Sequence, residues 1–129
     1  MTKAHFNLGT LFFYGRGGVT QDKAKAILYW EDGAKQGDAM SRHMLGLVEM
    51  GNVKVDRAVR HFVISAKMGY DNSLDALKEM FASGYATKQQ YVEALKGYQD
   101  AMEETKSPQR DEAARIGFTK FGKSEAVRP

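Results

Sequence analysis

Three glycines crowd the segment GRGG, residues 15–18, where backbone amides could hold a phosphate or a nucleic acid. A phosphate loop follows a β-strand and ends in Gly-Lys-Ser/Thr. Here the run NLGTLFFY, whose apolar residues are spaced as in a helix, precedes the glycines, and Val19-Thr20 follows them. A single Arg16-Gly17-Gly18 is too short for an RGG segment, which acts through repetition and disorder. The segment is therefore predicted to be a turn that uses glycines with positive φ.

The histidines and paired carboxylates lack the spacing that metal binding or acid–base catalysis needs. None of His5, His43 and His61 has another histidine four residues away, so they are predicted to be structural or surface residues. Ser41 and His43 are two residues apart, so on a helix their side chains diverge by about 200° and cannot form a nucleophile–base pair. Adjacent carboxylates also diverge, at Glu103-Glu104 and Asp111-Glu112. These patterns predict no enzyme and no cofactor.

The composition is that of one globular domain. The chain has 129 residues, 43% of them hydrophobic and 27% charged, and it has no cysteine for disulfides or thiolate chemistry. Its net charge of +3 lies in the segment 106–129, which has six Lys/Arg and three Asp/Glu. No apolar run approaches the roughly 20 residues of a membrane span, and MTKAHFNLG lacks the apolar core of a secretory signal. We therefore expect a cytoplasmic protein that does not bind a membrane.

Elements of the chain recur, with small residues and apolar residues at matching places. Leu8-Gly9 returns as Leu45-Gly46, and Gly37 returns as Gly69. Each unit reads as two helices with apolar residues three or four apart, and only the loop between them changes length. The sequence predicts a single domain over 1–117. Its parts are units of about 3–37, 38–69 and 70–105, a short helix over 107–117, and a disordered tail over 118–129.

The expected helix ends follow from local chemistry. Thr20 is expected to cap the second helix and Asp38 the third, because these side chains accept bonds from free amides. Glycine ends a helix in a left-handed conformation. Thr87 to Gln90 matches a capping box, and Ser107-Pro108 is typical of a new helix start. The expected glycine stops are Gly37, Gly69 and Gly84.

The repeated residues resemble the Sel-one-like repeat (SLR), a relative of the tetratricopeptide repeat. The match extends over about residues 3–105, and the third unit keeps Ala76-Leu77, Phe81 and Gly84 of the pattern before it drifts. It implies an all-α fold, a short right-handed solenoid of about three stacked antiparallel helical hairpins. It also implies an adaptor or scaffold for other proteins, without catalytic residues. The matching residues are Ala4, Leu8-Gly9, Leu11-Phe12, Gly15, Gly17, Asp22, Lys25-Ala26, Tyr29-Trp30, Ala34 and Gly37 in unit one, with Leu45-Gly46, Gly51, Arg57-Ala58, Phe62, Ala66 and Gly69 in unit two.

The large aromatic residues are expected to form the core, and the first helix to be partly uncovered. The inward stripe of that helix is predicted to hold Ala4, Leu8, Leu11 and Phe12. Because no hairpin precedes it in the sequence, we expect Phe6, Phe12 or Phe13 at an uncovered end, which would permit self-association. The core aromatics are predicted to be Phe12, Tyr29, Trp30, Phe62, Phe81 and Tyr98.

In related superhelices the first helix of each hairpin lines a concave groove, and the residues beside each Leu-Gly pair would project into it. Their spacing of four and then three residues places each trio on one helix face. The trios differ while the scaffold residues repeat, as expected of a binding surface; the alternative is that they pack between hairpins as core. The predicted groove residues are Lys3, Asn7 and Thr10, then Met40, Met44 and Leu47, then Asn72, Ala76 and Glu79.

The function predicted from the sequence is a non-catalytic interaction module that binds an unidentified protein or peptide in this groove. The apolar, adaptable side chains of Met40, Met44 and Leu47 would form its centre. The alternative is a nucleic-acid-associated protein that uses the basic tail together with Arg16-Gly17-Gly18, although a neutral body argues against a nucleic-acid partner.

Overall fold

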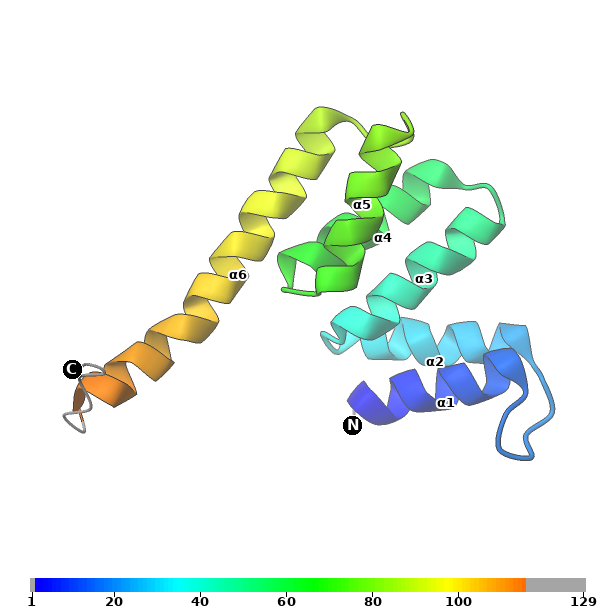
Figure 1. The fold of residues 1–129 in the computed structure, drawn as a ribbon. Helices are drawn as coiled ribbons and strands as arrows, with labels where there is room; N and C mark the ends of the chain where they lie inside the picture. Colours follow the sequence, from blue (N-terminus) through cyan, green and yellow to red (C-terminus); the bar gives the residue numbers. More distant parts are fainter. Residues whose placement is uncertain (1, 116–129) are drawn as a thin grey trace.

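The structure is a computed structural model that describes residues 2–115, with side chains to Lys106. Its described part contains only helices and no strand, which confirms the all-α prediction. In Figure 1 the helices follow one another as stacked antiparallel hairpins, and the C-terminal part of α6 extends beyond the body. The helices are α1 (Thr2–Tyr14), α2 (Lys23–Lys35), α3 (Ala39–Gly51), α4 (Val55–Lys67), α5 (Asp71–Ala82) and α6 (Lys88–Arg115).

The packing order follows the chain, as in a solenoid. α1 packs along α2 and α3 packs along α4, and the two hairpins meet where α2 contacts α3. α1 also touches α3. α4 then contacts both α5 and α6, so the third hairpin covers the second. Each unit therefore contacts its neighbours, which is the arrangement that the repeat pattern predicts.

Most helix ends agree with the local signals. Gly37, Gly69 and Gly84 all have positive φ, at 91°, 97° and 84°, and each lies two residues after the last residue of α2, α4 or α5. The Asp38 side chain accepts a hydrogen bond from the Ser41 amide at the start of α3. These ends were predictable because the capping residue acts on amides and carbonyls within one turn.

The start of α2 differs from the prediction. Asp22, not Thr20, caps the helix, and its carboxylate accepts a hydrogen bond from the Lys25 amide at 3.1 Å. The Asp22 amide in turn donates to the carbonyl of Phe12 at 2.8 Å. This link to the end of α1 selects Asp22, because it fixes where the chain turns into α2.

The end of the chain also differs. The prediction of a separate helix beginning at Ser107-Pro108 is wrong, because α6 continues without a break from Lys88 to Arg115. The capping box at its start is confirmed: the Thr87 amide donates to Gln90 Oε1 at 2.8 Å, and the Gln90 amide donates to Thr87 Oγ1 at 3.1 Å. The predicted disordered tail, 118–129, lies outside the described residues.

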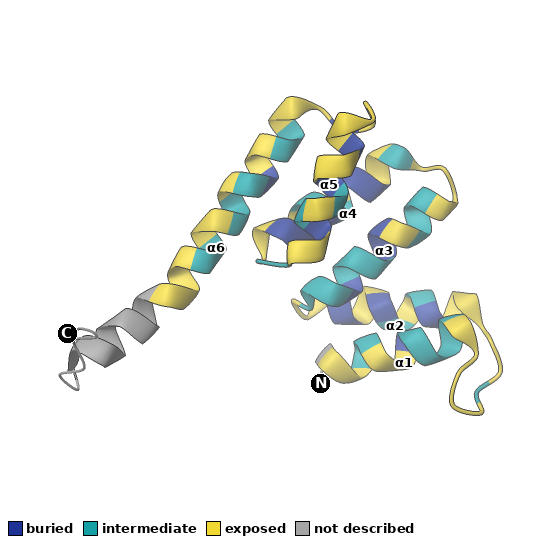
Figure 2. Ribbon diagram, in the orientation of Figure 1, coloured by how far each residue is buried: buried dark blue, intermediate teal, exposed yellow. Residues whose placement is uncertain are grey.

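Two buried clusters form the core (Figure 2). The smaller one, between α2 and α3, is centred on Trp30, with half-buried Phe6 and Phe13 packed against it. The larger one joins α4, α5 and α6 around Phe62 and Leu77. Trp30 and Phe62 are therefore core residues, as predicted. The members are Trp30, Ala34 and Leu45 in the first cluster, and Ala58, Val59, Phe62, Ala66, Leu77, Met80, Ala86 and Ala94 in the second.

The other predicted core aromatics lie nearer the surface. Phe81 is exposed and stacks on Tyr91, with ring centroids 5.8 Å apart. Phe12 and Tyr29 are half-buried and stack on each other at 5.7 Å. Tyr98 is half-buried, and its hydroxyl donates to Asp71 at 2.6 Å. Their polar or stacked partners hold these rings at helix edges, which helical periodicity alone does not reveal.

The inward stripe predicted for α1 is also corrected. Ala4 is exposed and Leu8 is 37% exposed, whereas Gly9 is the buried residue of the helix. Leu11 and Phe12 are half-buried. The inward face is rotated toward Gly9 because the large Trp30 ring takes the space directly below that glycine. Of the three phenylalanines expected at an uncovered end, Phe6 and Phe13 instead pack against the Trp30 cluster.

Candidate protein-binding surface

A glycine–aromatic contact sets the distance between the helices in each of the first two hairpins. A Cβ atom on Gly9 would overlap the Trp30 ring, and one on Gly46 would lie 2.6 Å from the Phe62 ring. In the first hairpin the Trp30 Nε1–H also donates to the Phe6 carbonyl at 3.2 Å. The repeated Leu-Gly pair thus lets a buried ring approach the helix backbone, and it gives α1 and α3 equivalent positions over α2 and α4.

The glycine loop after α1 is a turn, as its repeated context predicts. Gly15, Gly17 and Gly18 have φ of 67°, 64° and 80°. The equivalent turn after α3 contains Val53, which has a φ of 60° and is 80% exposed. A β-branched residue in this conformation is strained, because its Cβ approaches the backbone. The second turn therefore places a valine in the left-handed conformation that glycines adopt in the first turn.

The predicted residues of α1 line none of the hollows described below. Lys3 and Asn7 are exposed, and Thr10 is half-buried with its hydroxyl donating to the Phe6 carbonyl at 2.9 Å. Instead, Phe13 and Tyr14, at the end of α1, line a hollow of about 420 Å³ that faces α3. We call this the first hollow.

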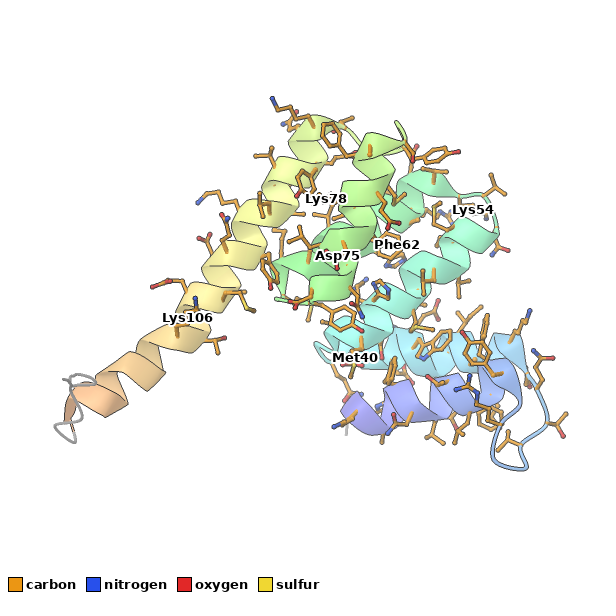
Figure 3. All side chains as sticks on the ribbon, in the orientation of Figure 1. Met40, Lys54, Phe62, Asp75, Lys78 and Lys106 are labelled. Atoms are coloured by element: carbon orange, nitrogen blue, oxygen red, sulfur yellow. The ribbon has the colours of Figure 1, made fainter. Side chains whose placement is uncertain are left out.

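Two predicted residues of α3 line the first hollow. Met44 and Leu47 line it from α3, as do Val48 and Gly51, while Phe13 and Tyr14 line it from α1 and Lys23 from α2. The buried Trp30 also lines it. Met40, in the first turn of α3, is half-buried and lies beside the end of α2 (Figure 3). The first hollow is thus a mainly apolar depression whose lining also contains Lys23 and Asn52.

A second hollow, of about 330 Å³, lies on the other side of Leu47. The structure brings Ala76 and Glu79 of α5 together with Leu47 of α3 there. Asn72, the remaining predicted residue, points to the Tyr70 hydroxyl at 3.2 Å. Four predicted residues, Met44, Leu47, Ala76 and Glu79, therefore line the two hollows, and Leu47 is shared by both. Whether this surface binds a partner stays a prediction.

Sequence reasoning missed several lining residues because they lie at helix ends or in turns. They are Phe13 and Tyr14 in the first hollow, and Met50, Met80 and Tyr85 in the second. A partial signal was present, since LFFY at the end of α1 has more consecutive apolar residues than one helix face can bury. Tyr85 carried no such signal, since its place depends on how the turn after α5 folds back.

A third hollow, of about 440 Å³ between α2, α3 and α4, has more ionisable side chains in its lining than the other two. Arg42 and His61 meet there, with Arg42 Nη1 3.4 Å from His61 Nδ1. Burial lowers the pKa of His61, the positive charges of Arg42 and Arg60 lower it further, and Glu49 opposes them. Arg42 Nε is buried without a hydrogen-bond partner among the described residues. No hydroxyl nucleophile lines this hollow.

In the structure the serine partner of His43 is Ser73, and not the Ser41 considered from the sequence. Ser41 Oγ donates to the Asp38 carboxylate, whereas His43 Nδ1 lies 2.6 Å from Ser73 Oγ on α5. Burial lowers the pKa of His43. Ser73 is completely buried, so this pair cannot receive a substrate and instead ties α3 to α5. Within residues 2–115, no group of three His, Cys, Asp or Glu side chains could hold a metal ion.

The residues behind the nucleic-acid alternative are only partly described. The basic tail lies mostly beyond residue 115. Arg16 lies over the Tyr14 ring, 4.5 Å from its centroid. Among the described helices, none has both the length and the apolar character that a membrane crossing requires.

Comparison with known protein families finds a match over the first unit of the chain. The model of the Sel1 repeat family matches residues 2–38, which comprise α1, the glycine loop, α2 and its glycine stop. No curated protein and no solved structure matches the chain.

Proposed function

We propose that this chain, a Sel1-repeat protein, is a non-catalytic scaffold that binds a peptide or helix of another protein across α3. Sel1-repeat proteins generally mediate protein interactions and are typically non-catalytic. The observation that carries the proposal is Leu47, which is 46% exposed and stands between two apolar hollows. An exposed leucine between two apolar depressions is suited to contact apolar side chains on either side of it.

The side chains around Leu47 favour an interface over an isolated surface leucine. Met44, Met50 and Met80 line the hollows, and methionine adapts its shape to different apolar partners. Burying apolar area releases about 25 cal/mol per Å², so a partner that covers Leu47 and fills both hollows gains most of its affinity there.

The test is a pull-down with the full chain that compares Leu47→Glu with the wild type. A carboxylate in the centre of an apolar interface is costly to desolvate, so we expect recovered partner proteins to fall at least tenfold. Leu28→Glu is the matched control, because Leu28 is 63% exposed on α2 and lines neither hollow. Circular dichroism checks that both variants fold. Equal recovery with both variants would rule out this surface.

A further inference from the structure

Charge changes steadily along the three helices that carry the hollows. α1 has one lysine and no carboxylate, and α3 has one arginine and one glutamate. α5 has three carboxylates and one lysine. The net charge of these helices thus becomes more negative from the first hairpin to the third.

The charges at the edges of the two hollows follow this order. Lys23 lines the first hollow, with its Nζ 5.2 Å from the centroid of the Phe13 ring, and Arg16 lies over Tyr14 nearby. No carboxylate lines this hollow. Neither cation forms an ion pair within the described part of the chain. Both are therefore free to pair with a carboxylate of a partner.

The second hollow has the opposite charge. Glu79 lines it, and Asp75 lies one helical turn earlier on the same face of α5 (Figure 3). No lysine or arginine lines this hollow, and Lys78 projects about 100° away from Glu79 around the helix. Among residues 3–106, neither Glu79 nor Asp75 has an ion-pair partner.

Resting on the proposed function, we propose that the partner is an amphipathic segment whose charges run opposite to those of this surface. This segment places one apolar side chain in each hollow. A carboxylate next to its first apolar side chain pairs with Lys23, and a cation next to its second pairs with Glu79. Such complementarity selects partners and fixes their orientation, because a reversed segment would bring like charges together. Lys23 and Glu79 thus determine the orientation in which the segment binds.

The experiment uses a display library of random 12-residue peptides, selected on the immobilised full chain. The comparison is the double variant Lys23→Glu/Glu79→Lys, which keeps the net charge. Both changes suit the helix dipoles, since Lys23 begins α2 and Glu79 is near the end of α5, so the variant should fold. The matched control is Lys96→Glu/Asp100→Lys, which reverses an exposed ion pair on α6, away from both hollows.

We expect the wild type and the α6 control to enrich peptides with one order of acidic and basic residues around an apolar pair. The double variant should enrich the reverse order. A synthesised peptide that was selected on the wild-type protein should bind the double variant about tenfold more weakly than it binds the wild type. Enriched apolar peptides with no preferred charge order would overturn this inference and leave the binding surface standing. Enriched peptides that also bind Leu47→Glu undiminished, or no enrichment at all, would overturn the proposed function as well.

Discussion

At the scale of single residues, the hairpins depend on glycines that face aromatic rings. Gly46 lies against Phe62, and Gly9 lies against Trp30, so each ring takes the space that a side chain would fill. A helical glycine usually lowers stability by about 0.5–1 kcal/mol relative to alanine. Here the loss is offset by the burial of a complete aromatic ring against the helix backbone.

Gly46→Ala should therefore lower the free energy of unfolding, by about 1–3 kcal/mol, despite the better helix propensity of alanine. The new Cβ would meet the rigid Phe62 ring at 2.6 Å. The matched control is Gly51→Ala, at the end of the same helix, where a Cβ would have no atom within 4 Å. Urea unfolding should show Gly51→Ala to be neutral or stabilising. Equal effects of the two substitutions would contradict the role given to the ring.

The sequence allowed the Leu-Gly pair to be recognised as part of the repeated scaffold, because the pair recurs; its close contact with an aromatic ring comes from the structure. It did not show that Phe81 and Tyr98 stay near the surface. Phe81 stacks on Tyr91 of α6, and Tyr98 bonds to Asp71 of α5, so both contacts depend on where α6 crosses α5. A crossing angle is a tertiary property, and periodicity within one helix does not contain it.

At the scale of helices, two histidines make polar contacts between α3 and its neighbours. His43 on α3 meets Ser73 on α5, and His61 on α4 meets Arg42 on α3. Burial lowers the pKa of both imidazoles below the ordinary value of 6.5, and neighbouring Arg42 adds to the effect at His61. The neutral forms are therefore the ones that suit these helix contacts.

Stability should consequently fall on mild acidification. The unfolded chain takes up protons near pH 6.5, whereas the folded chain resists protonation of both histidines until lower pH. Stability is thus greatest above pH 6.5 and is lost as the pH falls toward the lowered folded-state pKa values. Urea unfolding at pH 7.5 and 5.5 measures this loss. His43→Asn/His61→Asn should flatten the dependence, and an equally steep dependence in that variant would show that other groups cause it.

Helix ends were the most predictable elements, and their failures have local causes. Asp38, Thr87 and the glycine stops act within a single turn, so a short stretch of sequence determines them. Asp22 replaced Thr20 because its amide also bonds to α1. At Ser107-Pro108 the start signal was present, but the preceding residues already formed a helix that continues through it.

At the scale of the molecule, the core is divided. Trp30 centres the cluster between α2 and α3, while Phe62 and Leu77 belong to the larger cluster of α4, α5 and α6. Units that contact only their neighbours can lose structure one at a time. The first hairpin, held by the smaller cluster, should open more readily than the rest.

Trp30→Ala should cost about 3–5 kcal/mol, and the cost should fall mainly on the first hairpin. Amide hydrogen exchange should become faster in α1 and α2, while amides in α4 and α5 keep most of their protection. Trp30→Phe, which retains a ring opposite Gly9, should lose less. A stability loss below about 1 kcal/mol, or uniform loss of protection, would contradict the division of the core.

The proposed binding surface was only partly predictable from the sequence, because it depends on how neighbouring hairpins are placed relative to each other. Periodicity placed Met44 and Leu47 on one face of their helix, and Ala76 and Glu79 on one face of theirs, and these residues line the hollows. It also included Lys3, Asn7 and Thr10, although the part of α1 that meets α3 across the first hollow is its end. Which turn of one helix faces the next depends on the angle between hairpins, which no single unit specifies.

Trp30 is the single tryptophan of the chain and is completely shielded from water. Its indole emission is therefore a natural optical reporter, and the reporter belongs to the smaller cluster alone. Far-ultraviolet circular dichroism instead averages over all the helices. When the two signals are followed together, any separation between their unfolding curves measures directly how strongly the first hairpin is coupled to the rest of the array.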